Sequence, residues 1–278
     1  MTPLDLRVRA CDRTFSIASA DPATAALVHV VFGGLAVAAE VSDAPVRRYF
    51  VEPLPDGFRV WDGSCETVLE DEDSLLFHLD KEIILALQYE RPDLLFLHAA
   101  ALAGQHRVAV LCAPSGTGKS TLTLAAMGSG LAYLSDELAP IDVSRMEVHP
   151  YPHALCLKSP PPPPHRLPAA TVAHAGRFQV PVRALGGEPH LRPLPLAAFI
   201  FLRREPGRES GLRPISRASA VARLMANTLN ALAHPNAGLD VTVALSEAVP
   251  CFELDLDQLS AAVDAIASVL ADDDPVRA

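Results

Sequence analysis

Residues 113–120 carry the clearest chemical signal in the chain. They read Ala-Pro-Ser-Gly-Thr-Gly-Lys-Ser and fit the phosphate-loop pattern G-x-x-x-x-G-K-[ST], with Ala113 in place of the first glycine. Lys119 offers a point charge for the β- and γ-phosphates of a nucleotide, and the Ser120 hydroxyl can bind Mg²⁺. The segment follows the apolar run Val108–Cys112, so the predicted order is strand, glycine loop, helix. An ordinary strand-to-helix turn rich in small residues is the alternative.

Two glycines give this loop the backbone freedom that anion binding requires. Gly116 and Gly118 let backbone N–H groups turn toward an anion without a Cβ in the way. The helix that starts near Lys119 adds free N–H groups and the positive end of its dipole. We therefore expect ATP and Mg²⁺ to bind to one continuous run of residues: Ser115, Gly116, Thr117, Gly118, Lys119, Ser120 and Thr121.

His98 precedes the glycine loop at a spacing that could bring it beside the loop in a hairpin. Leu94–Ala103 is predicted to be a strand that pairs with Val108–Cys112 through a turn at residues 104–106. If the hairpin is centred on Gln105, residue 98 lies opposite residue 112, where antiparallel neighbours are ~5 Å apart. His98 would then lie beside the loop as a catalytic residue, although a lone histidine on an apolar strand is often an ordinary core residue.

Two adjacent carboxylates follow the next predicted strand, Leu131–Leu134. Asp136 and Glu137 come directly after Ser135, one strand–helix unit beyond the glycine loop. Catalytic acids lie at such carboxyl ends in open α/β sheets, and we expect this strand to neighbour the loop strand. Side chains alternate along an extended backbone, so one carboxylate can face a metal while the other faces an incoming hydroxyl. The alternative is that one of them caps a turn.

The periodicity of the remaining chain predicts an α/β protein with two domains. Residues 1–90 form a small α+β domain with a helix from Asp21 to about Phe32 and another opened by the cap Asp73-Ser74. Residues 91–278 form the larger domain, which includes a helix capped by Ser216 and ending near Ala233. Its further expected elements are a buried strand at 196–202, a strand at 249–254 and a helix at 258–270.

Composition excludes several classes of function. The chain has 278 residues and a net charge of −10, which argues against nucleic-acid binding. The first residues lack an apolar signal core, and no run approaches the length of a membrane span. The five cysteines are scattered and form no zinc pattern, which favours a reduced, cytoplasmic protein.

The motifs together resemble the catalytic domain of HPr kinase/phosphorylase, most closely at residues 90–160. The resemblance implies a phosphate-loop kinase core akin to phosphoenolpyruvate carboxykinase. It also implies that Asp136 acts on the acceptor hydroxyl, that Glu137 and Ser120 hold the metal, and that His98 lies beside them. Some HPr-kinase-related proteins phosphorylate ribosomally made precursor peptides, including those of lasso peptides, and relatives form homo-oligomers.

Three positions depart from the family pattern. Ala113 replaces glycine, Thr121 stands where glutamate is usual, and Glu137 stands where aspartate is usual. The glycine-rich segment tied to phosphorolysis is also not found, which argues against phosphorylase activity and against HPr as substrate.

The sequence therefore predicts an ATP- and Mg²⁺-dependent kinase that acts on a Ser or Thr hydroxyl of a peptide or small protein. The alternatives are a small-molecule kinase and a nucleotide-binding regulatory module that transfers nothing. The carboxylate pair favours transfer, because binding alone needs Lys119 and Ser120 but no second carboxylate.

Overall fold

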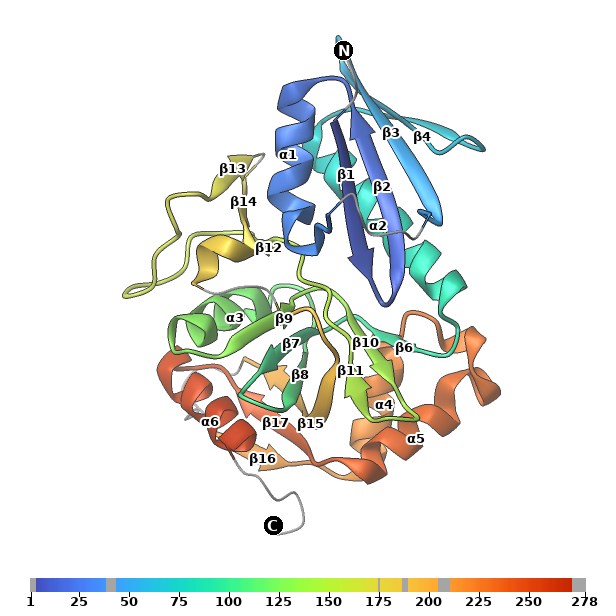
Figure 1. The fold of residues 1–278 in the computed structure, drawn as a ribbon. Coiled ribbons are helices and arrows are strands. Elements are labelled where there is room, and N and C mark those ends of the chain that lie inside the picture. The colour runs from blue at the N-terminus through green and yellow to red at the C-terminus, as the bar shows by residue number, and fades with distance from the viewer. Residues whose placement is uncertain (1–3, 39–43, 175, 187–189, 205–210, 272–278) are drawn as a thin grey trace. The chain divides into compact units, whose positions relative to one another are not determined.

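A computed structural model describes residues 4–38, 44–174, 176–186, 190–204 and 211–271 (Figure 1). The described residues form a mixed α/β fold and divide into two compact units. The first unit comprises Met1–Arg91, His153–Pro160 and Leu167–Ala184; the second comprises Pro92–Pro152, Pro161–Arg166 and Leu185–Ala278. Division into independently folding domains at residues 90 and 91 stays a prediction.

The first unit is built on a five-stranded sheet of order β1-β2-β3-β4-β5. These strands are β1 (Leu4–Ala10), β2 (Arg13–Ser19), β3 (Arg47–Leu54), β4 (Gly57–Trp61) and β5 (Glu66–Leu69). Helix α1 (Pro22–Phe32), which leads into η1 (Gly33–Leu35), packs against β1, β2 and β3, and α2 (Glu72–Glu90) packs against β2, β4 and β5. A second, three-stranded sheet comes from later in the chain: β12 (Leu155–Leu157), β14 (Arg177–Val180) and β13 (Val172–His174), followed by η2 (Val182–Leu185).

The two helices of this unit begin at capping aspartates. Asp21 accepts a hydrogen bond from the Thr24 amide (2.7 Å), which confirms the predicted start of α1. The predicted cap of α2 was wrong by two residues. Asp71, not Asp73, accepts from the Ser74 amide at 2.8 Å. An N-cap oxygen must reach the N–H two or three residues ahead, and the Asp71 carboxylate satisfies that spacing.

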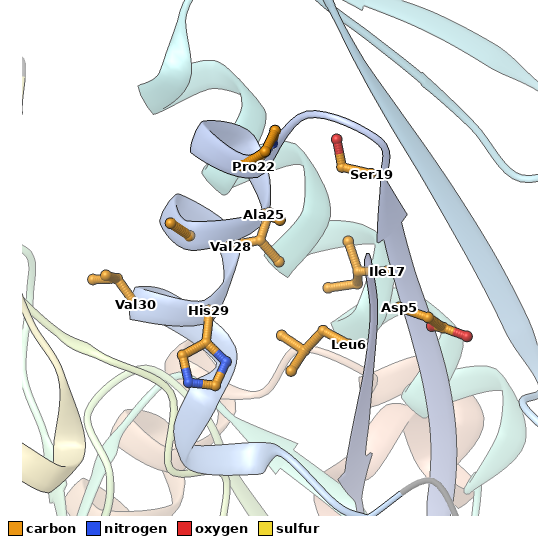
Figure 2. Close-up of a pocket in the computed structure, with 10 residues that line it drawn as sticks. Asp5, Leu6, Ile17, Ser19, Pro22, Ala25, Val28, His29 and Val30 are labelled. Atoms are coloured by element: carbon orange, nitrogen blue, oxygen red, sulfur yellow. The ribbon is translucent and has the colours of Figure 1, made fainter. Parts of the chain in front are cut away.

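A cavity of about 540 Å³ lies between α1 and the strands β1 and β2 (Figure 2). Its walls include the apolar side chains of Leu6, Ile17 and Val28, with Asp5 and His29 among the polar residues that line it. None of the predicted site residues lines this cavity.

The second unit is built on a large sheet whose main path runs β6-β10-β11-β15-β8-β7-β9, with β17 beside β15 and β16 beside β17. Its strands are β6 (Leu95–Leu97), β7 (Ala100–Ala103), β8 (Val108–Cys112), β9 (Ala132–Ser135), β10 (Ala139–Asp142), β11 (Glu147–Val148), β15 (Leu194–Arg203), β16 (Leu212–Pro214) and β17 (Cys251–Asp255). β15 is parallel to both β8 and β17, so the carboxyl ends of these three strands share one edge of the sheet.

Helices cover both faces of this sheet. α3 (Lys119–Gly128) and α6 (Leu259–Ala271) pack on the face that contains Ala109 and Leu111 of β8. α4 (Arg217–Asn227) and α5 (Leu239–Ala248) pack on the face that contains Val108, Val110 and Cys112. Two covered faces are typical of parallel strands and explain why β8 is apolar at every position. Between α4 and α5 the chain forms η3 (Ala231–Ala233) and η4 (Pro235–Gly238).

The strand predicted over residues 94–103 is interrupted at His98. Its first part, β6, pairs with β10, whereas its second part, β7, pairs with β8. The hairpin register is also shifted from the prediction, because Ala100 pairs with Leu111 and Ala103 with Val108. Residue 98 therefore does not lie opposite residue 112. Local pattern could not show this, because both parts are equally apolar and differ only in their distant partners.

The predicted neighbour of β9 was also wrong. β9 pairs with β7, which separates it from the loop strand β8. Because β9 and β8 are both antiparallel to β7, they still point the same way. The carboxyl end of β9 thus remains at the same edge of the sheet as the glycine loop.

Helix α4 ends at Asn227, earlier than the predicted end near Ala233. The residues after it extend along β6 instead, since Thr228 forms a bridge with Leu97 and the Leu229 amide donates to the Phe96 carbonyl (2.8 Å). This segment, 227–230, supplies backbone partners to the edge of β6, and tertiary pairing overrides the helical pattern.

Candidate functional site

The glycine loop connects β8 to α3, as the phosphate-loop pattern predicts. Gly116 and Gly118 have φ angles of 86° and 111°, in the region that L side chains rarely adopt. Gly118 precedes the first residue of α3, and its carbonyl accepts the first helical hydrogen bond, from the Leu122 amide at 2.9 Å. Ala113, which replaces the usual glycine, is 3% exposed and packs in the core beneath α3 and α6.

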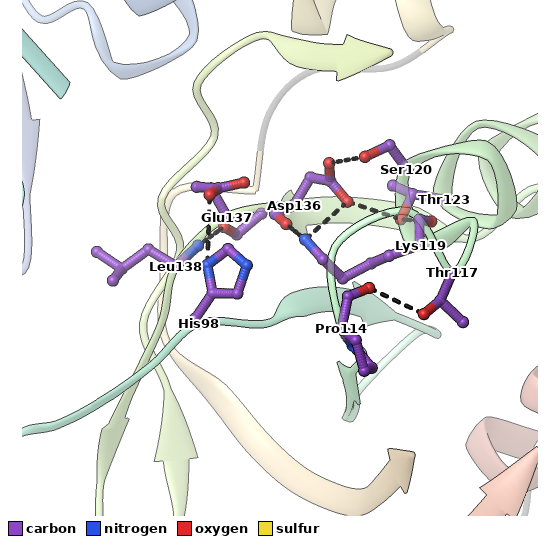
Figure 3. A network of polar contacts seen from close by, with 10 residues as sticks. His98, Pro114, Thr117, Lys119, Ser120, Thr123, Asp136, Glu137 and Leu138 are labelled. Atoms are coloured by element: carbon purple, nitrogen blue, oxygen red, sulfur yellow. Dashed lines mark hydrogen bonds and ion pairs between the residues drawn. The ribbon is translucent and has the colours of Figure 1, made fainter. Parts of the chain in front are cut away.

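Lys119 and Ser120 of α3 converge on Asp136, which follows β9 (Figure 3). The Ser120 hydroxyl donates to Asp136 Oδ2 at 2.5 Å, and Lys119 Nζ lies 3.5 Å from Asp136 Oδ1. Lys119 Nζ also donates to the Asp136 backbone carbonyl. Thr123, one turn further along α3, places its hydroxyl 3.3 Å from Asp136 Oδ1.

Lys119, Thr123 and Asp136 are buried, whereas Ser120 is half-buried. Asp136 is 2% exposed and Lys119 is 9% exposed. Removing a carboxylate and an ammonium from water costs several kcal/mol each, so each depends on the other and on the hydroxyls of Ser120 and Thr123. A bound phosphate would meet a lysine and a helix N-terminus that are already held in place.

Glu137 points elsewhere and pairs with His98. The histidine Nδ1 lies 3.3 Å from Glu137 Oε1, and the two side chains are 35% and 42% exposed. The amide of His98 donates to the Asn227 carbonyl at 2.8 Å, which ties the residue between β6 and β7 to the segment after α4. Ser135 Oγ accepts from the Leu138 amide at 3.1 Å and holds the turn that contains both carboxylates. His98 and Glu137 are more exposed than Lys119 and Asp136, so this pair can contact a second molecule.

The arrangement differs from the expected roles in one respect. The sequence resemblance implies that Glu137 holds a metal together with Ser120, but the Ser120 hydroxyl contacts Asp136. Sequence reasoning also missed Thr123, whose signal was its position four residues after Lys119, on the same side of a helix. Thr121, an expected nucleotide contact, lies half-buried on α3.

The side chains around Ser120 suit a hard divalent cation shared with a nucleotide. Hydroxyl and carboxylate oxygens are the ligands that Mg²⁺ prefers, and Ser120 and Asp136 present both. In the described part of the chain, no group of three or more His, Cys, Asp or Glu side chains is placed to hold a metal by itself. Mg²⁺ commonly combines one or two protein ligands with substrate phosphates and water, which fits this donor set.

Comparisons with known proteins give likenesses in structure but none in sequence. No family model matches the chain, and no curated protein matches it in sequence. A solved structure of the HPr(Ser) kinase/phosphatase from Coxiella burnetii is similar, with a TM-score of 0.34 and 11% identity, over 63% of this chain and 93% of that one. A likeness at this level does not define the fold or the activity of this chain.

No helix within the described ranges combines the length and the apolar character that crossing a membrane requires.

Proposed function

We propose that this protein is an ATP- and Mg²⁺-dependent kinase with a phosphate-loop core of the HPr kinase and phosphoenolpyruvate carboxykinase type. It transfers the γ-phosphoryl group to a Ser or Thr hydroxyl of a peptide or small protein. The observation that carries the proposal is the convergence of Lys119 and Ser120 on Asp136, with the next residue, Glu137, paired to His98. A binding module needs only the first half of this arrangement.

The nucleotide is held by the glycine loop and the first turn of α3. The N–H groups of residues 115–120 and the Lys119 ammonium neutralise the β- and γ-phosphates, with Thr121 beside them on the helix. Phosphoryl transfer requires positioning and charge stabilisation more than covalent help, and a buried, pre-placed lysine supplies both.

The roles of the two carboxylates are exchanged in this proposal relative to the sequence expectation. The Asp136 carboxylate accepts a hydrogen bond from the Ser120 hydroxyl, so the two groups lie close enough that they would hold Mg²⁺ together. When bound, the ion supplies positive charge that offsets the charge of the phosphates.

Glu137 and His98 then serve the acceptor. The acceptor hydroxyl oxygen bonds to the γ-phosphorus as the bond to the ADP leaving oxygen breaks, and the hydroxyl proton passes to Glu137. His98, 3.3 Å from this carboxylate, orients it. A positioned base of this kind contributes about 10²–10⁴ in rate. The peptide or small-protein class of acceptor and homo-oligomer formation rest on the motif resemblance, whereas a cytoplasmic location rests on the scattered cysteines.

The test is transfer of labelled γ-phosphate from ATP to a library of Ser- and Thr-containing peptides, read by mass spectrometry, with small alcohols as a parallel arm. We expect Mg²⁺-dependent phosphopeptides from the wild type and none from Lys119→Ala, whose calorimetric affinity for ATP should also fall. Unchanged ATP affinity in Lys119→Ala would remove the phosphate-loop assignment. Labelling of small alcohols alone would replace the peptide acceptor with a small molecule.

A further inference from the structure

Four large apolar side chains are exposed along one segment of the second unit. They are Leu229, Leu232, Leu239 and Val243, together called the apolar surface below, and Leu232 is the most exposed of them, at 91%. The first two belong to the connection between α4 and α5, and the last two lie one turn apart on α5. Residues 228–246 include one charged residue, Asp240, although 20% of the whole chain is charged. Exposed apolar side chains with few charges among them are typical of the centre of a protein interface.

The backbone beneath the apolar surface is fixed by specific contacts. Asn236, Ala237 and Gly238 have φ angles of 50°, 51° and 82°, in the left-handed region that is costly for alanine. Gly238 packs against Ala231, whose Cα would lie 3.4 Å from a Cβ on the glycine, and this contact joins the connection to the start of α5. Strained backbone of this kind is concentrated at sites that bind or react, and a surface that is already ordered loses less freedom when a partner binds.

The apolar surface begins beside the pair His98–Glu137. The Leu229 amide donates to the Phe96 carbonyl at 2.8 Å, two residues before His98. Because a strand rises about 3.3 Å per residue, Leu229 lies ~7 Å along the strand from His98. All of these residues belong to the second unit. In the proposed kinase, His98 and Glu137 serve the acceptor hydroxyl, so a polypeptide whose Ser or Thr lies there can extend over Leu229 toward Leu232.

We propose that the apolar surface binds apolar side chains of the acceptor polypeptide, two or more positions away from the Ser or Thr that receives the phosphate. This inference rests on the proposed function and adds the chemistry of the partner to it. Residues 228–246 contain no Lys or Arg that could pair with an acidic flanking sequence, and they offer only Asp240 to a basic one. An apolar flank is therefore the best match, and a second copy of this chain is the competing occupant.

Short peptides with a central Ser test the apolar surface. One series carries a single Leu at successive positions on either side of the Ser, and the parent peptide carries only Gly and Ala there. With ATP and Mg²⁺, we expect Leu at particular positions to lower KM about tenfold without changing kcat, because apolar burial stabilises the bound ground state and the transition state equally. Leu229→Ser and Leu232→Ser should remove this advantage and leave KM for the parent peptide unchanged. Leu232→Met, which keeps an apolar side chain, should retain it.

Leu191→Ser is the matched control. Leu191 is 59% exposed in the same unit and precedes the amino end of β15, whereas the glycine loop follows the carboxyl end of the parallel strand β8. This variant should keep the full advantage of the leucine peptides. Absence of any such advantage in the wild type, or an equal loss toward leucine and parent peptides in Leu232→Ser, would overturn the proposal. So would a Leu232→Ser variant that keeps the advantage but loses an oligomeric state in sedimentation, because the surface would then join two copies.

A fluorescent leucine peptide with Ala in place of the acceptor Ser separates docking from transfer. Its anisotropy should report binding that Leu232→Ser weakens about tenfold and Leu191→Ser leaves unchanged. If this binding is found but no peptide is phosphorylated, the proposed function fails while the docking surface is supported. If peptides are phosphorylated without any dependence on Leu229 or Leu232, the proposed function stands and the docking surface fails.

Discussion

Asp136 and Glu137 are adjacent in sequence and have different environments. Asp136 is 2% exposed and contacts Ser120 and Thr123, whereas the Glu137 side chain is 42% exposed and contacts His98. Both residues lie in the bend that follows β9, where the Ser135 hydroxyl accepts from the Leu138 amide, and this bend directs the two side chains to different partners. One pair of carboxylates can therefore serve two purposes without competing for the same space.

Two substitutions separate these purposes. Asp136→Asn should weaken Mg²⁺-dependent ATP binding, because a neutral amide is a poor ligand for a hard cation. Glu137→Gln should keep ATP and Mg²⁺ affinity near normal and slow transfer by roughly 10²-fold or more, because the acceptor proton loses its base. Calorimetry and single-turnover transfer measure the two effects.

The opposite pattern would restore the roles that the sequence resemblance implies. In that case, Glu137→Gln would weaken Mg²⁺-dependent binding, and Asp136→Asn would bind normally but transfer slowly. A third result, in which Asp136→Asn only lowers stability by about 1 kcal/mol, would make Asp136 a turn cap. Melting curves of both variants identify that case.

The carboxyl group of Glu253 should make the stability of the protein depend on pH. Its hydrogen bond with Arg223 lowers the pKa of this carboxyl below the ordinary 4.5. A carboxyl whose pKa is lowered on folding stabilises the folded state above pH 4.5. This stabilisation is lost as the pH falls through the folded-state pKa. We therefore expect the difference in unfolding free energy between wild type and Glu253→Gln to shrink from pH 7 to pH 3. Urea titrations at intervals of pH measure it, and a constant difference would contradict the prediction.

At the scale of elements, β6, the strand that precedes His98, is held by a side chain from the segment after α4. The Asn230 Oδ1 accepts from the Phe96 amide at 2.9 Å, and its Nδ2 donates to the Leu94 carbonyl at 2.8 Å. The side-chain amide of Asn230 thus serves one donor and one acceptor at the edge of β6, where the Leu94 carbonyl also lies 3.2 Å from His234 Nε2, and Asn230 is 7% exposed. His98 itself donates to Asn227 in the same segment.

Asn230→Ala should therefore destabilise the protein by about 1–3 kcal/mol, because the buried Phe96 amide loses its partner, whereas the Leu94 carbonyl keeps its contact with His234 Nε2 at 3.2 Å. Transfer activity should fall with it under conditions where the protein stays folded, because His98 loses its support. Arg217→Ala, a surface ion-pair control, should cost at most about 1 kcal/mol. If the denaturant midpoints of Asn230→Ala and Arg217→Ala coincide, the hydrogen bonds of Asn230 to the edge of β6 do not contribute to stability as expected.

At the scale of the whole molecule, the first unit takes segments from two parts of the chain. The Ala154 amide donates to the Val31 carbonyl of α1 at 2.7 Å, and Arg177 lies 3.1 Å from Asp73 of α2. His153 lies 4.0 Å from Asp80 of the same helix. Residues 153–184 thus supply polar partners to both helices of the unit.

We expect a fragment of residues 1–91 to be less stable than the same fragment joined to residues 153–184 by a flexible linker. The difference should be roughly 2 kcal/mol or more, from hydrogen bonds worth about 1 kcal/mol each and the apolar contacts around them. Equilibrium urea unfolding of the two fragments measures it. Equal midpoints would show that residues 1–90 fold without the later segments, as the predicted domain boundary requires.

The local features of this protein follow from its sequence. Gly116 and Gly118 mark the loop because their positive φ angles disfavour other residues, and Asp21 marks the start of α1 because a carboxylate satisfies free N–H groups there. The helix α3 and the carboxylates after β9 were also located from local pattern. These signals need only a few neighbouring residues.

Only the tertiary structure decided which distant residues meet. The interruption at His98, the placing of β7 between β8 and β9, and the contact of Ser120 with Asp136 all depend on strand pairing. Apolar strands such as β6, β7 and β8 are alike in composition, so their pattern leaves partner and register open. The pairing is settled by the joint burial of the whole sheet under four helices, and that burial is a property of the entire unit.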